Sequence, residues 1–251
     1  MYLDSNWSIL AVDPVRGSLT NSGSGNLTAV ALEPLKILCR GADLQMVERA
    51  ISNHIHNSLL ASERAQLGIL FPPFYALFKS DENKEYIVEL FDRMARLAPT
   101  GFPWHRGRPT FVCIRSEADA SPYRSTVPNL WDQCTESSPS TPETIHPIAS
   151  YETNILFICR PFFRLPYDSD GPAPEQCPSV EGNKFTDEPV HAVFANRATY
   201  ITTFAVNAYS HLPNARRVGS YIDLLNFALG WSANVALTQP WTYLLFERCR
   251  S

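Results

Sequence analysis

The stretch ILFICRPFFRLP, residues 155–166, decides how the rest of the chain is interpreted. It begins with a short apolar run that contains Cys159, which is the pattern of a buried strand. An aromatic pair and a Leu-Pro step follow this run. The stretch therefore predicts a strand over residues 154–159, ahead of two long helical patterns.

The same stretch resembles the segment before the zinc helix in fungal secreted metallopeptidases of the deuterolysin and lysine-specific endopeptidase type. The next helix of that family carries His-Glu-x-x-His, because two imidazoles four residues apart face one zinc ion and the Glu activates its water. No such motif occurs in this chain. Near the end, WTYLLF at residues 241–246 is similar to a second motif of the family. The resemblance covers residues 39–249 and implies a zinc-free relative with one α+β, zincin-like domain, helix-rich around a small sheet.

Two registers can be tried for the missing zinc helix. Counting forward from Cys177 places the motif at residues 191–195, where only His191 matches. Counting back from the segment 241–246 places it at residues 203–207, TFAVN, where no ligand matches. Both registers lack the Glu that acts as general base. The expected third-ligand region holds one displaced carboxylate, Asp223, so we expect no metal and no other cofactor.

Length and composition favour one domain that spans residues 1–251. A hydrophobic content of 45% in 251 residues is enough for one well-buried core. The formal net charge of -4 leaves no basic stripe, which argues against nucleic acid or an anionic membrane surface as the main partner. No apolar run approaches the roughly 18 residues that a membrane-spanning helix needs. We therefore expect neither a nucleic-acid partner nor a membrane span, and the oligomeric state stays open.

Cysteine usage bears on the compartment. An even, widely spread set without a CxxC pair fits three disulfides: Cys39, Cys113, Cys134, Cys159, Cys177 and Cys249. The N-terminus MYLDSNWSILAV lacks the pattern of a signal peptide, so either the protein is cytosolic or a signal peptide has been removed. The cysteine pattern favours secretion or a secretory-pathway lumen. Sequons at Asn6 and Asn26 fit a glycoprotein.

Proximity along the chain and the family resemblance together favour particular cysteine pairs. They favour Cys113 with Cys134 and Cys159 with Cys177, which leaves Cys39 with Cys249. With all cysteines bridged, a thiol nucleophile is not expected. Hydrolase, kinase-like and dinucleotide-binding classes also lack their motifs, because the chain has no Gly-x-Ser-x-Gly elbow, Gly-rich phosphate loop or dinucleotide fingerprint.

Hydrophobic periodicity predicts the elements that surround the site. Apolar residues at steps of three and four predict helices over 42–60 and 84–98, and helical patterns also cover 188–212 and 220–237. A short strand is predicted over 110–114, and the first forty residues read as strands and turns. The segment 115–147 is rich in Ser, Thr and Pro and is predicted to be a loop, and FPPFYALF at 71–78 is an aromatic link. His54 and His56 are two residues apart on a helix and are predicted to point to different sides.

If the fold survives without zinc, the former substrate cleft becomes an aromatic, neutral-polar concavity. The candidate catalytic residues are Tyr200, Thr203 and Asn207, and the candidate substrate-binding residues are Phe194, Phe204, Tyr209, Tyr221, Trp231 and Trp241. Such a cleft suits an uncharged apolar small molecule, which indicates a cofactor-free cyclase or pericyclase of fungal secondary metabolism. The alternative is a secreted pseudo-peptidase that binds a partner without turnover. Core packing of the same aromatic residues is the competing interpretation.

Overall fold

The computed structural model describes residues 9–10, 35–97, 108–136, 147–165, 196–209, 237 and 240–248. In this part of the chain five short strands form one mixed sheet in the order β1-β2-β3-β5-β4. β2 pairs with β3, and β3 with β5, in parallel, while β1 and β4 pair antiparallel at the two edges. The strands are β1 (Ile9–Leu10), β2 (Leu35–Leu38), β3 (Thr110–Cys113), β4 (Ile148–Ser150) and β5 (Ile155–Ile158).

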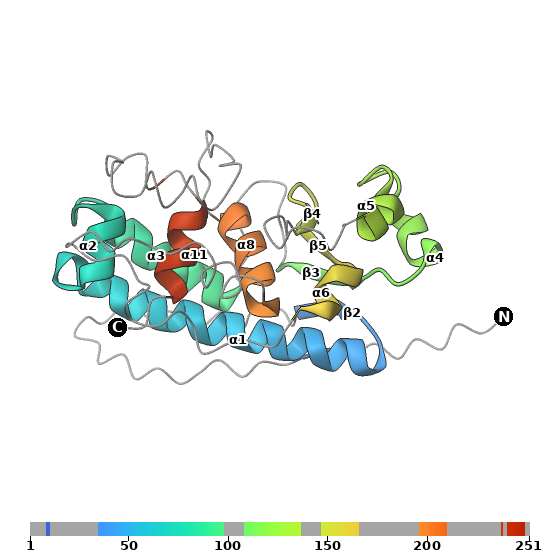
Figure 1. Cartoon of the computed structure of the whole chain (residues 1–251), viewed down its shortest axis with the longest axis horizontal. Helices are drawn as coiled ribbons and strands as arrows, with labels where there is room; N and C mark the ends of the chain where they lie inside the picture. Colours follow the sequence, from blue (N-terminus) through green and yellow to red (C-terminus); the bar gives the residue numbers. More distant parts are fainter. Residues whose placement is uncertain are drawn as a thin grey trace, which may run out of the picture.

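One long helix, α1 (Gly41–Gln66), organises the helical layer. It runs along one side of the molecule and packs against α3, α8 and α11, and its first turns reach the sheet (Figure 1). The helices of this layer are α1, α2 (Pro72–Phe78), α3 (Lys84–Arg96), α8 (Arg197–Tyr209) and α11 (Pro240–Arg248), with the 3-10 turn η1 (Gly68–Leu70). The shorter helices near the sheet are α4 (Glu117–Ala120), η2 (Ser121–Tyr123), α5 (Leu130–Glu136) and α6 (Arg160–Arg164).

The two amphipathic helices at the centre of this layer were expected from their apolar stripes. α3 forms within the predicted range 84–98 and buries Ile87, Leu90, Phe91 and Met94. α1 is longer than the predicted range 42–60, because its last turns bury small and polar side chains such as Ala61, Ser62 and Ala65. A pattern based on large apolar residues does not include such side chains, although they continue the same buried face of the helix.

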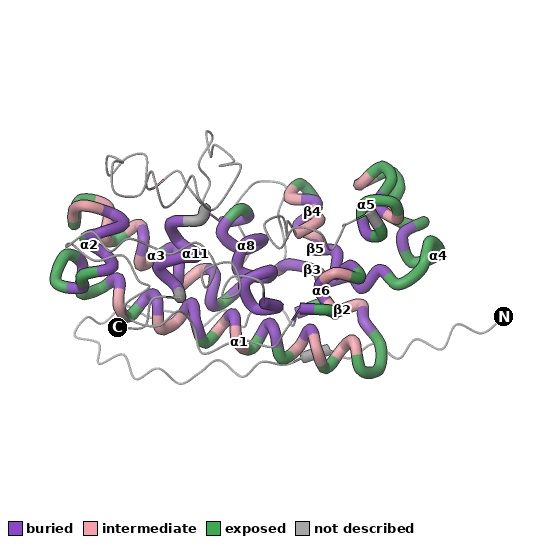
Figure 2. The backbone as a smooth tube through the Cα atoms, in the orientation of Figure 1, coloured by how far each residue is buried: buried purple, intermediate pink, exposed green. Residues whose placement is uncertain are grey.

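Both faces of the sheet are covered, so successive strand residues enter two different clusters. Phe111, Leu156 and Ile158 pack into the main core with the helical layer. Val112 and Phe157 point the other way and pack with Leu130 and Cys134 near α5. This alternation follows from the two-residue period of a strand. Figure 2 shows buried residues running through β3, β5, α8 and α11.

Helices form in the segment 115–147, which was predicted to be a loop, and in the segment 71–78, which was described only as an aromatic link. The described part of 115–147 folds into α4, η2 and α5, which corrects the prediction of a loop there. α4 forms because Ser116 and Asp119 make a capping box at its start, a local hydrogen-bonding device that composition does not reveal. The aromatic link at 71–78 is the helix α2, because its prolines lie in the first helical turn, where the missing N–H costs nothing.

The described disulfides differ from the three predicted pairs. They join Cys39 to Cys113 and Cys134 to Cys159, with Cα–Cα distances of 5.1 and 5.0 Å. The predictions of Cys113 with Cys134, Cys159 with Cys177 and Cys39 with Cys249 are therefore wrong. Cys177 and Cys249 lie outside the described residues.

Sheet order explains the observed pairs. Cys39 directly follows β2 and Cys113 ends β3, so the parallel pairing of these strands brings the two cysteines together. Cys159 directly follows β5, and α5 carries Cys134 into the same small cluster. Proximity along the chain misleads here, because neighbouring parallel strands are far apart in sequence.

The described elements confirm a helix-rich α+β protein with a small mixed sheet and disulfide staples. The predicted strands over 110–114 and 154–159 form as β3 and β5, and the apolar stretch 241–246 lies within α11. Of the predicted helix over 188–212 the structure describes 196–209, which contains α8, and of the helix over 220–237 it describes residue 237 only. None of the helices in the described ranges is long and apolar enough to cross a membrane.

Candidate functional site

Helix α8 carries five of the predicted site residues, and four of them lie on neighbouring faces. It follows β5 in the chain and packs against α1, α3, α6 and α11. At 100° per residue, Tyr200, Thr203 and Asn207 lie within an arc of about 60° on the helix, and Phe204 borders it. Every residue of α8 is buried except Asn207, which is exposed. The predicted catalytic residues therefore share one face that is open to solvent only near the C-terminal end of the helix.

Tyr200 ties α8 to the sheet. Its hydroxyl donates to the carbonyl oxygen of Phe157 at 3.0 Å and accepts from the N–H of Ile148 at 3.3 Å. Burial raises the pKa of Tyr200 well above its ordinary value, so the phenol stays neutral. Because its proton is directed at a backbone carbonyl, Tyr200 positions α8 against β4 and β5.

Three polar residues at successive turns of α8 form a ladder along this face. The Oγ1 of Thr203 donates to the carbonyl of Thr199 at 2.8 Å, and the Nδ2 of Asn207 donates to the carbonyl of Thr203 at 2.9 Å. The hydroxyl of Thr199 itself is buried and has no hydrogen-bond partner among the described residues. A buried hydroxyl without a partner costs about 1–3 kcal/mol, and buried polar groups in native proteins almost always have one. The Thr199 hydroxyl is therefore the unsatisfied end of the polar ladder Thr199–Thr203–Asn207.

Aromatic residues flank the polar ladder on the side of the β4–β5 turn. Phe204 is fully buried and stacks on the half-buried ring of Tyr151, with ring centroids 5.8 Å apart and an interplanar angle of 13°. Tyr209, at the end of α8, is buried as well, and burial raises the pKa of its phenol although Arg108 and Arg93 oppose this. These rings supply apolar surface next to the ladder.

The structure describes only some of the predicted substrate-binding residues. Phe194, Tyr221 and Trp231 lie outside the described residues, as does the side chain of Trp241, which is the second residue of α11. The described helix brings Tyr200, Thr203, Phe204 and Asn207 together. Their roles in binding or catalysis stay predictions.

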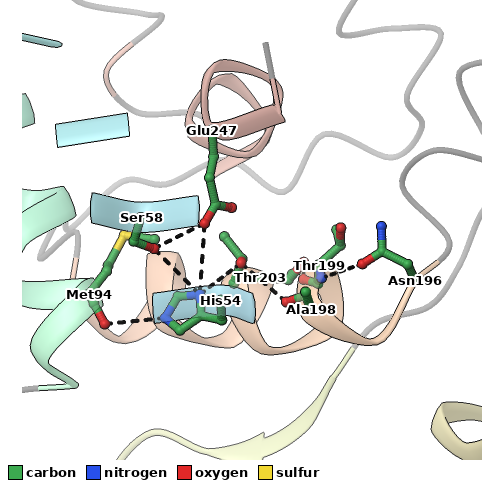
Figure 3. A network of polar contacts seen from close by, with 9 residues as sticks. His54, Ser58, Met94, Asn196, Ala198, Thr199, Thr203 and Glu247 are labelled. Atoms are coloured by element: carbon green, nitrogen blue, oxygen red, sulfur yellow. Dashed lines mark hydrogen bonds and ion pairs between the residues drawn. The ribbon is translucent and has the colours of Figure 1, made fainter. Parts of the chain in front are cut away.

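A second polar cluster, which the sequence did not predict, lies where α1, α3, α8 and α11 meet (Figure 3). His54 contacts the Oγ1 of Thr202 through Nδ1 at 2.8 Å and the carbonyl of Met94 through Nε2 at 3.2 Å. Ser58 donates to the Oε1 of Glu247 at 3.0 Å and lies 3.5 Å from the Nδ1 of His54. The Oε1 of Glu247 is 3.9 Å from the same Nδ1. We refer to His54, Ser58, Thr202 and Glu247 as the His54 cluster.

The His54 cluster is shielded from water. His54 and Ser58 are 0% exposed, Thr202 1% and Glu247 3%. Burial lowers the pKa of His54 to about 4, against a smaller raising effect of its hydrogen bond to the Met94 carbonyl. The ring is therefore neutral at pH 7. A carbonyl can only accept, so Nε2 carries the ring proton and Nδ1 accepts from Thr202.

A signal for part of this cluster is present in the sequence. His54 and Ser58 are four residues apart and lie on the same face of a helix as the apolar stripe of α1. The prediction that His54 and His56 point to different sides is confirmed, because His54 is buried and His56 is exposed. The partners Thr202 and Glu247 could not be predicted, because they come from helices far along the chain.

A metal site needs several ligand side chains close together. Among the described residues no group of three or more His, Cys, Asp or Glu side chains lies together as a metal site would require. The His54 cluster offers one imidazole and one carboxylate. His191, the single match of the first register, and Asp223, the displaced carboxylate of the expected third-ligand region, lie outside the described residues.

No protein-family model matches the sequence, and no curated protein matches it significantly. The functional assignment therefore depends on the residues of this chain.

Proposed function

We propose that the protein is a zinc-free, non-proteolytic relative of the zincin-like metallopeptidases that binds an apolar small molecule along the polar ladder of α8. The order of elements supports the relationship, because β5 precedes α8 as the resembled segment precedes the zinc helix. In the register 203–207 the places of the two His and the Glu are taken by Thr203, Asn207 and Phe204.

The unpartnered hydroxyl of Thr199 is the observation that carries the proposal. It is a buried donor at the inner end of a ladder whose outer end, Asn207, is exposed. A carbonyl or ether oxygen of a bound ligand would satisfy this hydroxyl and offset the cost of burying it. Phe204 and Tyr151 would supply apolar contact area to the part of the ligand that lies near the exposed Asn207 end of the ladder.

The same residues fit conversion of the ligand better than peptide hydrolysis. Phe204 replaces the general base, so activation of a water molecule has no group to perform it in this register. A cofactor-free cyclase or pericyclase needs mainly a reactive substrate held in a near-attack conformation. The second amide proton of Asn207 and the hydroxyl of Thr199 are the donors suited to polarise a substrate carbonyl, whereas Tyr200 and Thr203 direct their protons to the backbone.

The alternative is a pseudo-peptidase that binds a partner without turnover. The exposure of Asn207 favours it, because an amide on an open surface is accessible to a large partner as well as to a small molecule. In either case we propose a secreted or secretory-pathway protein, since disulfides form and persist mainly in oxidising compartments.

A titration with Nile red tests small-molecule binding. This dye is uncharged and apolar and carries a carbonyl acceptor, so it matches the chemistry of the ladder. We expect saturable fluorescence enhancement with the oxidised protein, and about tenfold weaker binding to Thr199→Val, which corresponds to one lost hydrogen bond.

Thr242→Val is the matched control for this titration. Thr242 lies on α11 and also has a buried hydroxyl without a partner, but it is not part of the ladder. We expect the affinity of this variant for the dye to equal that of the wild type. Absence of saturable binding, or equal weakening in both variants, would contradict the proposal.

A further inference from the structure

The His54 cluster joins three helices through one neutral ring. Nε2–H of His54 donates to the Met94 carbonyl on α3, and Nδ1 accepts from Thr202 on α8. His54 itself belongs to α1, so both ring nitrogens hold neighbouring helices. Because the ring is 0% exposed, water cannot substitute for either partner.

Thr202 has two acceptors for its single proton. Its Oγ1 lies 2.8 Å from the Nδ1 of His54 and 3.1 Å from the carbonyl oxygen of Ala198. With a neutral ring the proton points to Nδ1. If Nδ1 takes up a proton, it becomes a donor to Thr202, whose hydroxyl then turns to Ala198. The two protonation states therefore differ by one hydroxyl rotation.

The groups that face the ring come from four helices. α1 contributes the hydroxyl of Ser58, α3 the Met94 carbonyl, α8 the hydroxyl of Thr202 and α11 the carboxylate of Glu247. Of the carboxylates in the described residues, Glu247 alone comes within 4.0 Å of a ring nitrogen. It attracts a proton to the ring, but its Oε1 is held by Ser58 and lies 3.9 Å away.

We propose that the His54 cluster is an acid-sensitive lock, in which the neutral ring holds α1, α3 and α8 together and protonation of the ring weakens this layer. The reason is that a proton on His54 places a positive charge in a part of the core that has no contact with water. Thr202 of the His54 cluster directly precedes Thr203. Protonation of His54 therefore weakens the packing of α8 next to its polar ladder.

The sign of the pH dependence follows from the two states of the chain. Burial lowers the pKa of His54 to about 4 in the folded protein, whereas an unfolded histidine has a pKa of about 6.5. Between these values the unfolded chain binds more protons, so acidification favours unfolding. From pH 7 to pH 5 this histidine lowers the folding equilibrium constant by about 20-fold.

The test compares urea unfolding of the full oxidised chain at pH 7 and pH 5 in wild type, His54→Leu and His56→Leu. Leu at position 54 leaves no orphaned group, because the Met94 carbonyl still accepts from the N–H of Leu97 at 3.0 Å and Thr202 still has Ala198. His56 is exposed on the same helix and serves as the matched control. We expect the wild type and His56→Leu to lose about 20-fold more of the folding constant than His54→Leu.

If His54→Leu does not fold, nitrogen-15 NMR of the wild-type histidine rings tests whether the His54 ring is neutral. We expect one ring that stays neutral at pH 5 with its proton on Nε2. Parallel pH dependence in the wild type and His54→Leu, or an absence of any neutral Nε2–H ring at pH 5, would overturn the proposal.

Discussion

Replacement of Thr199 by valine should stabilise the free protein, although the residue belongs to the proposed site. Valine has nearly the shape of threonine and a similar helix propensity. The substitution removes a buried hydroxyl that has no partner, whose burial costs about 1–3 kcal/mol. The helix start is preserved, because the backbone N–H of Thr199 keeps its 2.8 Å hydrogen bond to the Oδ1 of Asn196. We expect a gain of about 1–2 kcal/mol in the free energy of unfolding, after allowance for local relaxation.

Urea unfolding and calorimetry of the oxidised protein measure this gain. A gain of 1–2 kcal/mol corresponds to a rise of about 2–8 °C in Tm for a chain of this size. Thr203→Val is the contrasting variant, because the Thr203 hydroxyl donates at 2.8 Å and its loss should be neutral or destabilising by up to about 1.5 kcal/mol. If Thr199→Val destabilises the protein by more than about 1 kcal/mol, the net contribution of one hydrogen bond, then the hydroxyl has a partner in solution and the reasoning fails.

Two further predictions concern the supports of α8 and of the sheet. Tyr200→Phe should lower the free energy of unfolding by about 1–3 kcal/mol in urea titrations. The reason is that the substitution removes the hydrogen-bond partner of the Ile148 N–H and of the Phe157 carbonyl. An unchanged free energy of unfolding would show that the Tyr200 hydroxyl is dispensable. Paired Cys→Ser replacement should cost about 4.5 kcal/mol for Cys39–Cys113, with 74 residues of separation, and about 3.5 kcal/mol for Cys134–Cys159, with 25. The reverse order in calorimetry would refute loop-closure entropy as the main term.

The elements with regular apolar patterns could be predicted from the sequence. α3 and the central part of α1 repeat at helical spacing, and β5 is a short apolar run, so local periodicity suffices for them. The end of α1 and the helix α2 could not be predicted in the same way. In the first, small and polar residues continue the buried face, and in the second, two prolines occupy the first turn of a helix of only seven residues.

The contacts that join distant parts of the chain could not be predicted from the periodicity of the sequence. The disulfides depend on which strands are neighbours in the sheet, and the nearest cysteine in sequence is not the nearest in space. The His54 cluster joins positions 148 and 189 residues apart through His54–Thr202 and Ser58–Glu247.

The candidate site was predicted in part. The four-residue spacing that selected Thr203 and Asn207 also leads back to Thr199, one turn earlier, but a threonine in a helix gives no sign that its hydroxyl lacks a partner. Only the packed structure shows that Thr203 donates to the carbonyl of Thr199 while the Thr199 hydroxyl donates to nothing.

The central claim is tested most directly by the metal content of the purified full chain. Elemental analysis measures this content, and a chelator-sensitive peptidase assay is run beside it. The claim is that α8 occupies the place of a zinc helix without holding zinc, since Thr203, Phe204 and Asn207 stand where two His and a Glu would be required. We predict no stoichiometric zinc and no cleavage of peptides, with or without added zinc. Stoichiometric zinc together with chelator-sensitive cleavage would contradict the account.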